Sequence, residues 1–405
     1  MQQLNILQVT EFFTPRTGGS TQVAFQTARH LACQGHRVTV ISSDFGKEDV
    51  SFEDDSFGLV QFHSLLTRWK FYVTPGLIPW IRKHIVEYDI IHMHNVRTFQ
   101  NAVVAEAAIR KQIPYVLSAH GSLPFLIGHH GIKRAFDLLF GRRLLAGASC
   151  LIAVSEVEIE QYVNWGIPRG KTAYIPNGLD LNEYSLLPSP RKFRRAYGIP
   201  GSEKLILFLG RLHKIKSIDM LLRAFAMLHS SEAAAKLVVA GPDEGELAGL
   251  EAIVKQLQLE KYVLFTGPLY GDQKLSAYVD SDIVVMPSKY EIFGLVAFEA
   301  LMCGTPVLIS KSSAAGKKLV DAGAAYAVPH NDPQIMANAI LDILECPAEA
   351  AESVARGQSF IRKHLGWESV INDTLALYRS LLGNPVEKLR AINLDETGRH
   401  IGDYA

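Results

Sequence analysis

The sequence predicts an α/β protein built from two doubly wound parallel-sheet domains. Short runs of Val, Ile and Leu alternate with longer stretches of helical periodicity. Such continuous apolar runs are typical of parallel strands that helices cover on both faces. The 405 residues are long for one hydrophobic core and sufficient for two. A stiff polar connector containing Pro188, Ser189 and Pro190 separates the pattern into two similar halves.

The expected strands indicate two domains and locate a candidate ligand-binding site. We expect residues 1–190 to form the first domain and residues 191–366 the second, followed by a helix over 367–382 and a tail over 383–405 with no assigned role. Ligands of open parallel sheets bind beyond the carboxyl ends of the strands, so the loops after the strands are the candidate site. The expected strands are 6–9, 38–41, 90–92, 116–119, 151–154 and 172–175, then 205–209, 237–240, 263–265, 283–286 and 307–309.

Composition excludes several classes of protein. The chain is 48% hydrophobic and 20% charged, as globular proteins are, and its formal net charge is zero. A neutral chain without a recognised binding module argues against a nucleic-acid partner. The four cysteines show no ligand spacing and indicate buried thiols in a reducing compartment. Neither a signal peptide nor an apolar run of about 18 to 20 residues is visible, so we expect a cytoplasmic protein without a membrane span.

Two glutamates flank a strand-to-helix turn in the second half. The segment Glu291 to Glu299 reads Glu-Ile-Phe-Gly-Leu-Val-Ala-Phe-Glu and follows the expected strand 283–286. A helix would begin at this turn. Its dipole and the N–H groups of Phe293, Gly294 and Leu295 favour an anionic or hydroxyl-rich ligand. Carboxylates at such a point can accept hydrogen bonds from sugar hydroxyls. The alternative is a solvated loop acid followed by an exposed helix acid.

Two cations follow the first expected strand of the second half. Gly210 and Arg211 come directly after the strand 205–209, and Lys216 lies five residues beyond Arg211. The planar guanidinium of arginine matches phosphate oxygens, and lysine adds a mobile point charge. Alone, this pair also fits a solvated helix start. Beside the two glutamates, it indicates a site for a phosphate-bearing ligand.

The first half carries a glycine pair and a histidine at strand ends. Gly18 and Gly19 follow the first strand and open a helix over residues 21–33. The glycines allow the backbone to approach a ligand, and the helix N-terminus adds positive potential. His120 ends the strand 116–119. The alternatives are a plain turn for the glycines and a structural role for the histidine.

The sequence disfavours a metal site. Asp280-Ser281-Asp282 has the Asp-x-Asp spacing of divalent-ion sites, but it closes a helix and opens a strand. The histidine pairs His92/His94 and His129/His130 have no nearby carboxylate in a ligand spacing. We therefore expect no bound metal.

One region combines basic and aromatic side chains. Trp69, Tyr72 and Trp80 lie among the basic residues between Arg68 and Lys83. Such a mixture suits an anionic membrane surface. The alternative is a helix that packs its aromatic side chains inward and leaves its basic residues in solvent.

The motifs together resemble those of a known enzyme family. Gly18-Gly19, His120, Arg211 with Lys216 and the segment from Glu291 to Glu299 are similar to the signatures of the retaining GT-B glycosyltransferases, specifically glycosyltransferase family 4 (group 1). The resemblance extends from Gly18 to the helix around Trp367. It implies the GT-B fold, in which two Rossmann-like domains face each other across a cleft and the C-terminal helix crosses back to the first domain.

The resemblance also implies roles for individual residues. It places Arg211 and Lys216 on the donor diphosphate, and Glu299 on the ribose hydroxyls. Two positions depart from the family: Ser217 stands where Gly is usual, and Lys318 where Glu is frequent. The expected catalytic residues are Arg211, Lys216, His120 and Glu291, and the expected donor-binding residues are Gly18, Gly19, Gly210, Phe293, Gly294, Leu295 and Glu299.

The expected activity follows from this resemblance. It implies a retaining, metal-independent hexosyltransferase that uses a UDP- or GDP-sugar and no cofactor, with the acceptor on the first domain and the donor on the second. A lipid-linked or polysaccharide precursor of cell-surface glycans is the expected acceptor. We expect the protein to bind peripherally to the inner face of the membrane through Arg68 to Lys83. The alternatives are a sugar-nucleotide epimerase of the same architecture and an inactive nucleotide-sugar-binding subunit.

Overall fold

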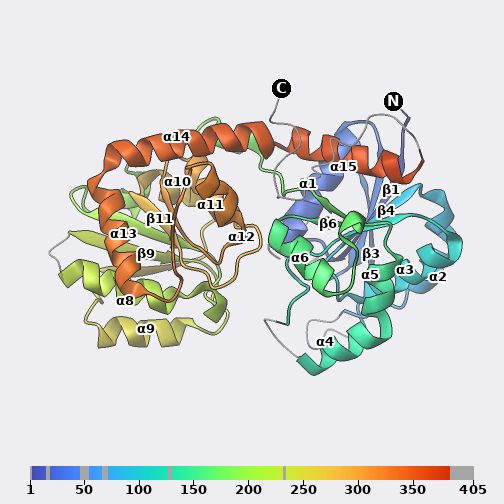
Figure 1. Ribbon diagram of the computed structural model, residues 1–405, viewed down its shortest axis with the longest axis horizontal. Helices are drawn as coiled ribbons and strands as arrows, with labels where there is room; N and C mark the ends of the chain where they lie inside the picture. Colours follow the sequence, from blue (N-terminus) through green and yellow to red (C-terminus); the bar gives the residue numbers. More distant parts are fainter. Residues whose placement is uncertain are drawn as a thin grey trace. The chain divides into compact units, whose positions relative to one another are not determined.

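The computed structural model divides into two compact units (Figure 1). The first consists of Met1–Gly178 together with the segment from Trp367 onward, and the second of Leu179–Gly366. The structure describes residues 2–14, 19–45, 54–65, 72–125, 130–230 and 234–383.

The second unit begins at Leu179 because this residue pairs with the end of the same unit. Its backbone N–H donates to the Leu365 carbonyl at 2.7 Å, and it forms an isolated parallel bridge with Gly366. Pro188 and Pro190, which we expected at the domain boundary, therefore lie inside the second unit.

The first unit contains a seven-stranded parallel sheet in the order β3-β2-β1-β4-β5-β6-β7. The strand order reverses between β1 and β4, and ligands of such sheets bind at this switch point. The strands are β1 Asn5–Phe12, β2 Arg37–Ser43, β3 Gly58–Phe62, β4 Ile90–His94, β5 Tyr115–Ser118, β6 Cys150–Ala153 and β7 Thr172–Tyr174. The helices are α1 Gly19–Cys33, α2 Leu77–His84, η2 Ile85–Glu87, α3 Phe99–Lys111, α4 His130–Phe136, the π-helical turn η3 Asp137–Gly141, α5 Arg142–Gly147, α6 Glu156–Asn164, η4 Arg169–Lys171 and α15 Trp367–Leu381.

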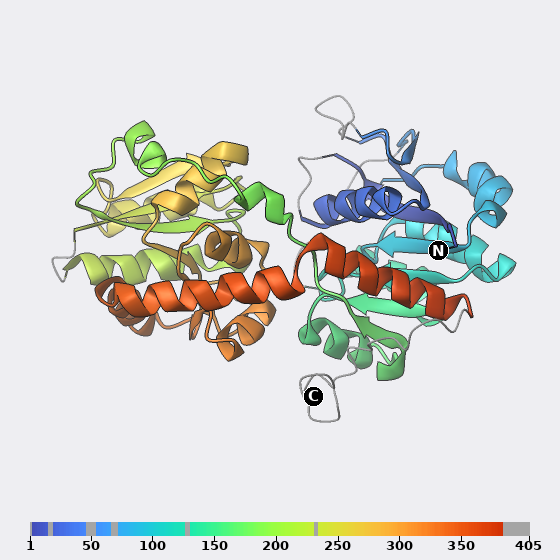
Figure 2. The same cartoon turned by 90° about the horizontal axis from the view of Figure 1, so that it is seen from above.

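The C-terminal helix α15 lies beside α1 in the first unit (Figure 2). Its residues Trp367 and Tyr378 are buried in the same core as Val23 and Ala28 of α1. The indole ring of Trp367 also stacks on His30, with 5.5 Å between the ring centroids. The apolar face of α15 is therefore part of the first hydrophobic core.

Replacing Gly178 by alanine is expected to destabilise the first unit by about 1 to 3 kcal/mol, the usual cost of overpacking. A Cβ atom at this position would lie 2.3 Å from Cδ2 of Trp367. The thermal unfolding midpoint, followed by tryptophan fluorescence, should therefore fall. Gly170→Ala is the matched control, because a Cβ there meets nothing within 4 Å. Equal midpoints for the two variants would contradict the close packing of Trp367 on Gly178.

The second unit contains a six-stranded parallel sheet in the order β10-β9-β8-β11-β12-β13. Its order reverses between β8 and β11, which makes the carboxyl ends of these two strands the second switch point. The strands are β8 Lys204–Leu209, β9 Ala235–Ala240, β10 Val263–Gly267, β11 Ile283–Met286, β12 Val307–Ser310 and β13 Tyr326–Val328. The helices are η5 Leu181–Tyr184, α7 Lys192–Ala196, η6 Lys214–Lys216, α8 Ile218–Ser230, α9 Leu247–Gln256, α10 Gly271–Asp280, α11 Leu295–Met302, α12 Ala314–Asp321, α13 Pro333–Glu345 and α14 Pro347–His364.

Candidate functional site

Backbone atoms approach closely at the carboxyl end of β8. Gly210 follows this strand, and the Gly210 N–H donates to the Ala240 carbonyl at the end of β9 at 2.9 Å. Gly241 has a φ of 151°, and a Cβ on it would lie 1.8 Å from the Gly210 carbonyl oxygen. Only glycine fits this position.

Lys216 and Glu291 form an ion pair at the same edge of the sheet. Lys216 Nζ contacts Glu291 Oε2, and the two side chains are only 15% and 17% exposed. The segment that carries Lys216 is tied to the loop after β11, because the Lys289 N–H donates to the Ile215 carbonyl at 2.8 Å. Ser217 has a φ of 51°. A left-handed conformation costs a non-glycine residue about 1–2 kcal/mol, which explains why glycine is the expected residue here.

The loop after β11 ends in a glycine that caps helix α11. Gly294 has a φ of 73°, and the helix begins at Leu295. Phe293 is buried and stacks on Phe298 with 5.0 Å between the ring centroids. The Ala314 N–H donates to the backbone carbonyl of Glu291 at 2.8 Å and holds the other end of the loop. The first N–H groups of α11 lack intrahelical partners and can bind a ligand.

Glu299 accepts hydrogen bonds from two residues of the neighbouring helix α10. Lys274 Nζ lies 3.0 Å from Glu299 Oε1, and the Tyr278 hydroxyl donates to Glu299 Oε2 at 2.7 Å. Burial opposes the charge of Lys274, but Glu299 and Glu183 outweigh it and raise its pKa. Burial and the Glu299 charge raise the pKa of Tyr278 well above its usual value. Both donors therefore keep their protons and fix the orientation of the Glu299 carboxylate.

Arg211 pairs with a residue that the sequence did not indicate. Its Nη1 lies 2.8 and 3.0 Å from the two carboxylate oxygens of Glu244. The Arg211 side chain is 48% exposed, and exposed ion pairs contribute only about 0 to 1 kcal/mol. An anionic ligand can therefore displace Glu244 from Arg211 at small cost.

The glycine pair of the first unit is only partly described. Gly18 lies outside the described residues, and Gly19 is the first residue of α1. Because α1 begins at Gly19 after β1 ends, its N-terminus lies on the side of the sheet where the strands have their carboxyl ends.

The buried His92 and His94 and the half-buried His120 stack at the carboxyl ends of β4 and β5. His92 contacts the Tyr378 hydroxyl through Nδ1 (2.7 Å) and Ser118 Oγ through Nε2 (2.9 Å). His94 Nδ1 lies 3.0 Å from His120 Nε2, and the ring centroids of these two residues are 5.3 Å apart. Burial lowers the pKa of His92 to about 3, lowers that of His120 to about 4, and lowers that of His94. All three rings are therefore neutral near pH 7.

The hydrogen bonds around Gln8 define the tautomer of His120. Both ends of the Gln8 amide are satisfied when its Nε2 donates to His94 Nε2 (3.0 Å) and to the Ala24 carbonyl (3.1 Å). His94 then carries its proton on Nδ1 and donates it to His120 Nε2. The remaining proton of His120 is on Nδ1, which is buried and has no hydrogen-bond partner among the described residues. His120 thus holds one buried N–H that has no partner among the described residues.

A buried glutamate, which the sequence analysis missed, supports the turn after His120. Glu158 Oε1 accepts from the Gly121 N–H at 2.6 Å, and Oε2 accepts from the Val154 N–H at 2.9 Å. Burial raises the pKa of Glu158 to about 7. Ser155 caps α6 three residues earlier by accepting from the Glu158 N–H. The Ser-x-x-Glu spacing is a capping-box signal and could have identified this glutamate.

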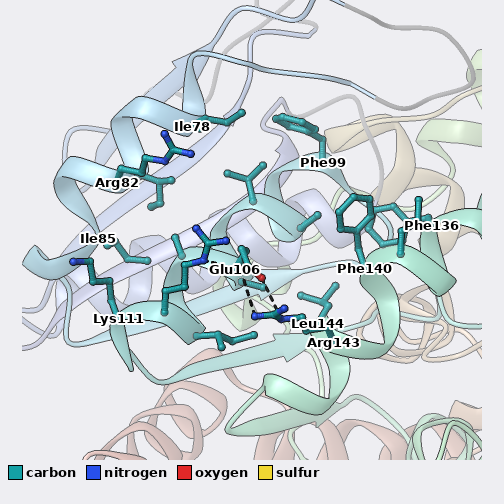
Figure 3. A pocket seen from close by; sticks show the side chains of 18 residues that line it. Ile78, Arg82, Ile85, Phe99, Glu106, Lys111, Phe136, Phe140, Arg143 and Leu144 are labelled. Atoms are coloured by element: carbon teal, nitrogen blue, oxygen red, sulfur yellow. Dashed lines mark hydrogen bonds and ion pairs between the residues drawn. The ribbon is translucent and has the colours of Figure 1, made fainter.

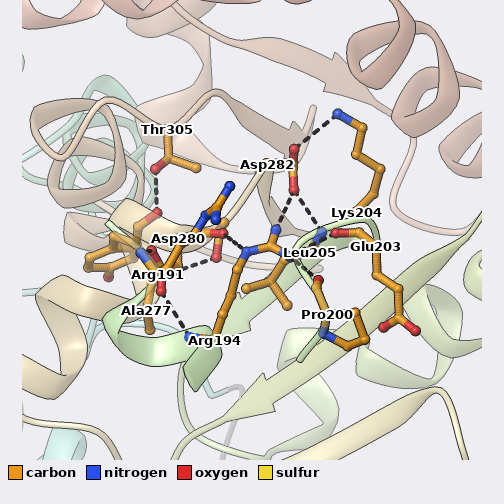
Figure 4. A network of polar contacts seen from close by, with 12 residues as sticks. Arg191, Arg194, Pro200, Glu203, Lys204, Leu205, Ala277, Asp280, Asp282 and Thr305 are labelled. Atoms are coloured by element: carbon orange, nitrogen blue, oxygen red, sulfur yellow. Dashed lines mark hydrogen bonds and ion pairs between the residues drawn. The ribbon is translucent and has the colours of Figure 1, made fainter. Parts of the chain in front are cut away.

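The aspartates of the Asp-x-Asp motif hold the start of the second unit in place (Figure 4). Asp280 Oδ2 accepts from the Arg194 N–H at 2.9 Å. Asp282 Oδ2 accepts from Arg194 Nη2 and from the Leu205 N–H, both at 2.8 Å. Within the described part of the chain, no group of three or more His, Cys, Asp or Glu is placed to hold a metal ion.

Two family models match the chain, one in each half. The model described as Glycosyltransferase Family 4 matches residues 17–183, and the model described as Glycosyl transferases group 1 matches residues 190–359. The two matches together cover most of the chain. The chain belongs to the GT-B glycosyltransferases. All expected site residues of this glycosyltransferase lie within the two matched ranges.

Relatives of this glycosyltransferase match along most of its length. A D-inositol 3-phosphate glycosyltransferase of Kineococcus radiotolerans is 26% identical over 406 residues, which cover 91% of this chain and 85% of the relative. An uncharacterized glycosyltransferase of Methanocaldococcus jannaschii is 28% identical over 394 residues, which cover 93% of this chain and 98% of the relative.

Solved structures show the same fold as this glycosyltransferase. HepE of Anabaena, in complex with UDP and glucose, has a TM-score of 0.77 and 21% identity, with 93% of this chain and 100% of that chain covered. A sucrose-phosphate synthase of Thermosynechococcus elongatus has a TM-score of 0.76 and 23% identity, with 94% and 100% covered. The predicted fold class is confirmed.

The expected membrane-binding segment is described only in part. Residues 66–71, which include Arg68 and Trp69, lie outside the described residues. Tyr72 is buried, and Trp80 is half-buried against the core. The described aromatic side chains of this segment, Tyr72 and Trp80, thus pack inward, as the alternative interpretation expects. Among the helices of the described residues, none is both long and apolar enough to span a membrane.

Proposed function

We propose that this glycosyltransferase moves a hexosyl group from a UDP- or GDP-sugar to an acceptor hydroxyl, with retention of configuration and without a metal ion. The observation that carries the proposal is the ion pair of Lys216 with Glu291 at the second switch point. It brings a cation and a carboxylate together in the loops beside the N-terminus of α11. A donor with an anionic diphosphate and a hydroxyl-rich sugar requires this combination of groups.

The second unit would bind the donor through groups of complementary chemistry. Lys216 and Arg211 would neutralise the diphosphate, on which negative charge grows as the glycosidic bond breaks. Glu291 would accept hydrogen bonds from the sugar, with the N–H groups of Phe293, Gly294 and Leu295 adding donors. Glu299, already oriented by two neighbours, would accept from the ribose hydroxyls.

The hydrogen bonds that the Asp280, Asp282 and Glu158 carboxylates accept within the fold support a direct displacement without a metal ion. Asp280 and Asp282 hold backbone and Arg194 donors, so their carboxylates are occupied in the fold. Glu158 is fully buried, and both its oxygens accept from backbone N–H groups. It is therefore not presented as a nucleophile, which favours attack at the front face over a covalent intermediate.

Nucleotide binding tests the donor part of the proposal. UDP is the first probe because the HepE structure of Anabaena contains it, with GDP and ADP as comparisons. At a hundred times its dissociation constant, the correct nucleotide should stabilise the protein by about 2.7 kcal/mol. Transfer to an acceptor separates the transferase from an epimerase, which would isomerise the donor alone. Binding with no turnover would instead identify an inactive binding subunit.

Glu299→Gln should weaken binding of the preferred nucleotide about 10- to 100-fold, because hydrogen bonds to charged groups contribute about 1.5–3 kcal/mol. Tyr278→Phe keeps the carboxylate but removes one orienting donor, and it should have a smaller effect. Glu251→Gln, on the exposed surface of α9, is the matched control. Isothermal titration calorimetry measures all three. Unchanged affinity in Glu299→Gln would remove this residue from the ribose site.

We also propose that the acceptor is a lipid-linked or polysaccharide precursor and that the protein binds the inner face of the membrane peripherally. The excess of basic over acidic residues between Arg68 and Arg143 supports this. Arg82 and Lys83 are exposed and are available to an anionic surface. Because Tyr72 and Trp80 pack inward, the apolar part of the contact must come from other residues.

A further inference from the structure

The first unit contains an apolar groove away from the histidine cluster (Figure 3). Its volume is about 850 Å³, which is within the range of ligand pockets, about 300–1,000 Å³. Figure 3 shows it between α2, α3 and the segment from α4 to α5. The apolar residues of the lining include Ile78, Ile85, Phe99, Phe136, Phe140 and Leu144.

Basic side chains line the same groove. Arg82, Arg110, Lys111 and Arg143 belong to its wall, and Glu106 is its only acidic residue. Glu106 is already engaged, because Arg110 Nε lies 2.7 Å from its Oε1 and Arg143 Nε lies 3.1 Å from its Oε2. The groove therefore keeps a net positive charge beside an apolar interior. This combination is complementary to a molecule with an apolar chain and an anionic head.

Large apolar side chains are exposed at the edge of the groove. Leu138, Leu139 and Phe140 of the π-helical turn η3 are 75%, 68% and 47% exposed. A buried ion pair holds the turn in place. The Asp137 carboxylate accepts from Arg97 Nε and Nη2 at 2.9 Å each, and both side chains are 9% exposed. A firmly held turn that exposes three large apolar residues in sequence indicates a contact surface.

We propose that this groove binds the acyl chain of an anionic membrane lipid, with the headgroup phosphate held by Arg82, Lys111 and Arg143 and with Leu138 and Leu139 entering the bilayer interface. The charge of the wall favours a lipid over a second copy of the chain, because another basic groove would be repelled. This lipid site would provide the membrane association proposed above and rests on it. It does not depend on the transfer reaction.

Vesicle sedimentation of the full chain tests the proposal. The protein should sediment with vesicles of phosphatidylglycerol and phosphatidylcholine and remain in the supernatant with phosphatidylcholine alone. The double variant Leu139→Gln/Phe140→Ser should bind the anionic vesicles at least tenfold more weakly, because two apolar side chains lose their burial. The double variant Arg82→Gln/Lys111→Gln should lose about fivefold for each charge removed. All four positions are exposed, so the fold should tolerate these changes.

Positions outside the groove supply the controls. Val86 is 61% exposed and Lys255, on α9 of the second unit, is exposed, and neither lines the groove. Val86→Gln and Lys255→Gln should each bind vesicles within about twofold of the parent. Undiminished vesicle binding by the Leu139→Gln/Phe140→Ser variant would overturn the groove while keeping the membrane association. Absence of binding to anionic vesicles would overturn both, and a dimer that Leu139→Gln dissociates would replace the lipid by a second copy. Nucleotide binding measured in parallel keeps these outcomes separate from the transfer reaction.

Discussion

Replacing Lys216 by alanine is expected to lower kcat about 10²- to 10³-fold, the usual loss when a group that stabilises transition-state charge is removed. The ammonium group is positioned by Glu291 and only 15% exposed, and a partly desolvated charge acts more strongly on a nearby diphosphate than one in water. The measurement is steady-state transfer or donor hydrolysis with the nucleotide sugar that binds best.

Lys214→Ala is the matched control for this prediction. Lys214 lies on the same short helix η6, is 83% exposed and reaches Glu246 only at 4.0 Å. Its loss should change kcat less than twofold. Lys216→Arg keeps the charge opposite Glu291 and should restore part of the activity, since guanidinium geometry differs from that of an ammonium group. If Lys216→Ala and Lys214→Ala were equally active, the proposed role of Lys216 on the diphosphate would be wrong.

The first unit is expected to lose stability steeply between about pH 6.5 and pH 4.5. His92 and His120 have pKa values of about 3 and 4 in the fold and near 6.5 in the unfolded chain, and the pKa of His94 is lowered also. Around the middle of this pH window these three histidines bind up to three protons in the unfolded chain that they do not bind in the fold, and His36, whose pKa burial also lowers, acts in the same direction. Protonation of the unfolded chain lowers the free energy of unfolding as the pH falls.

Glu158 acts in the opposite direction in the same window. Its pKa is about 7 in the fold and 4.5 in its ordinary state, so the folded protein binds one proton that the unfolded chain does not. The difference of three protons and one proton leaves a net of two, which corresponds to roughly 3 kcal/mol of unfolding free energy for each pH unit. The three histidines therefore dominate over Glu158.

Denaturant unfolding at several pH values measures this slope. All four tryptophans, at positions 69, 80, 165 and 367, belong to the first unit, so tryptophan fluorescence reports on the unit that holds the histidines. His92→Asn should reduce the pH slope by about half, from two net protons to one. His63→Asn, whose side chain is 78% exposed, should leave the slope unchanged. A parent protein equally stable at pH 4.5 and 6.5 would refute the burial of three neutral imidazoles.

The strands of both sheets could be predicted because their central residues are continuous apolar runs. The exception in the first unit is β3, where Gly58 and Gln61 interrupt the run, the strand lies at the sheet edge and none of its residues is fully buried. β13 was missed as well, although β7, which also has three residues and lies at an edge, was predicted. The unit boundary was missed because the pairing of Leu179 with Leu365 joins distant positions and leaves no local pattern.

Some residues of the candidate site could also be predicted from the sequence, and others could not. Lys216, Glu291 and Glu299 stand in short motifs next to predicted strands, so their neighbourhood could be inferred from the sequence. Lys274 and Tyr278 contact Glu299 only because α10 packs beside α11. A contact between two helices depends on their packing, and neither residue stands in a motif. Glu244 likewise meets Arg211 through the adjacent ends of β8 and β9.

The order of the units along the chain has a consequence for biosynthesis. The second unit is one continuous stretch, Leu179–Gly366, inserted into the first. During translation, its entire sequence is synthesised before α15. The first unit must therefore wait, with the side of its core that receives Trp367 and Tyr378 still uncovered, until α15 emerges from the ribosome.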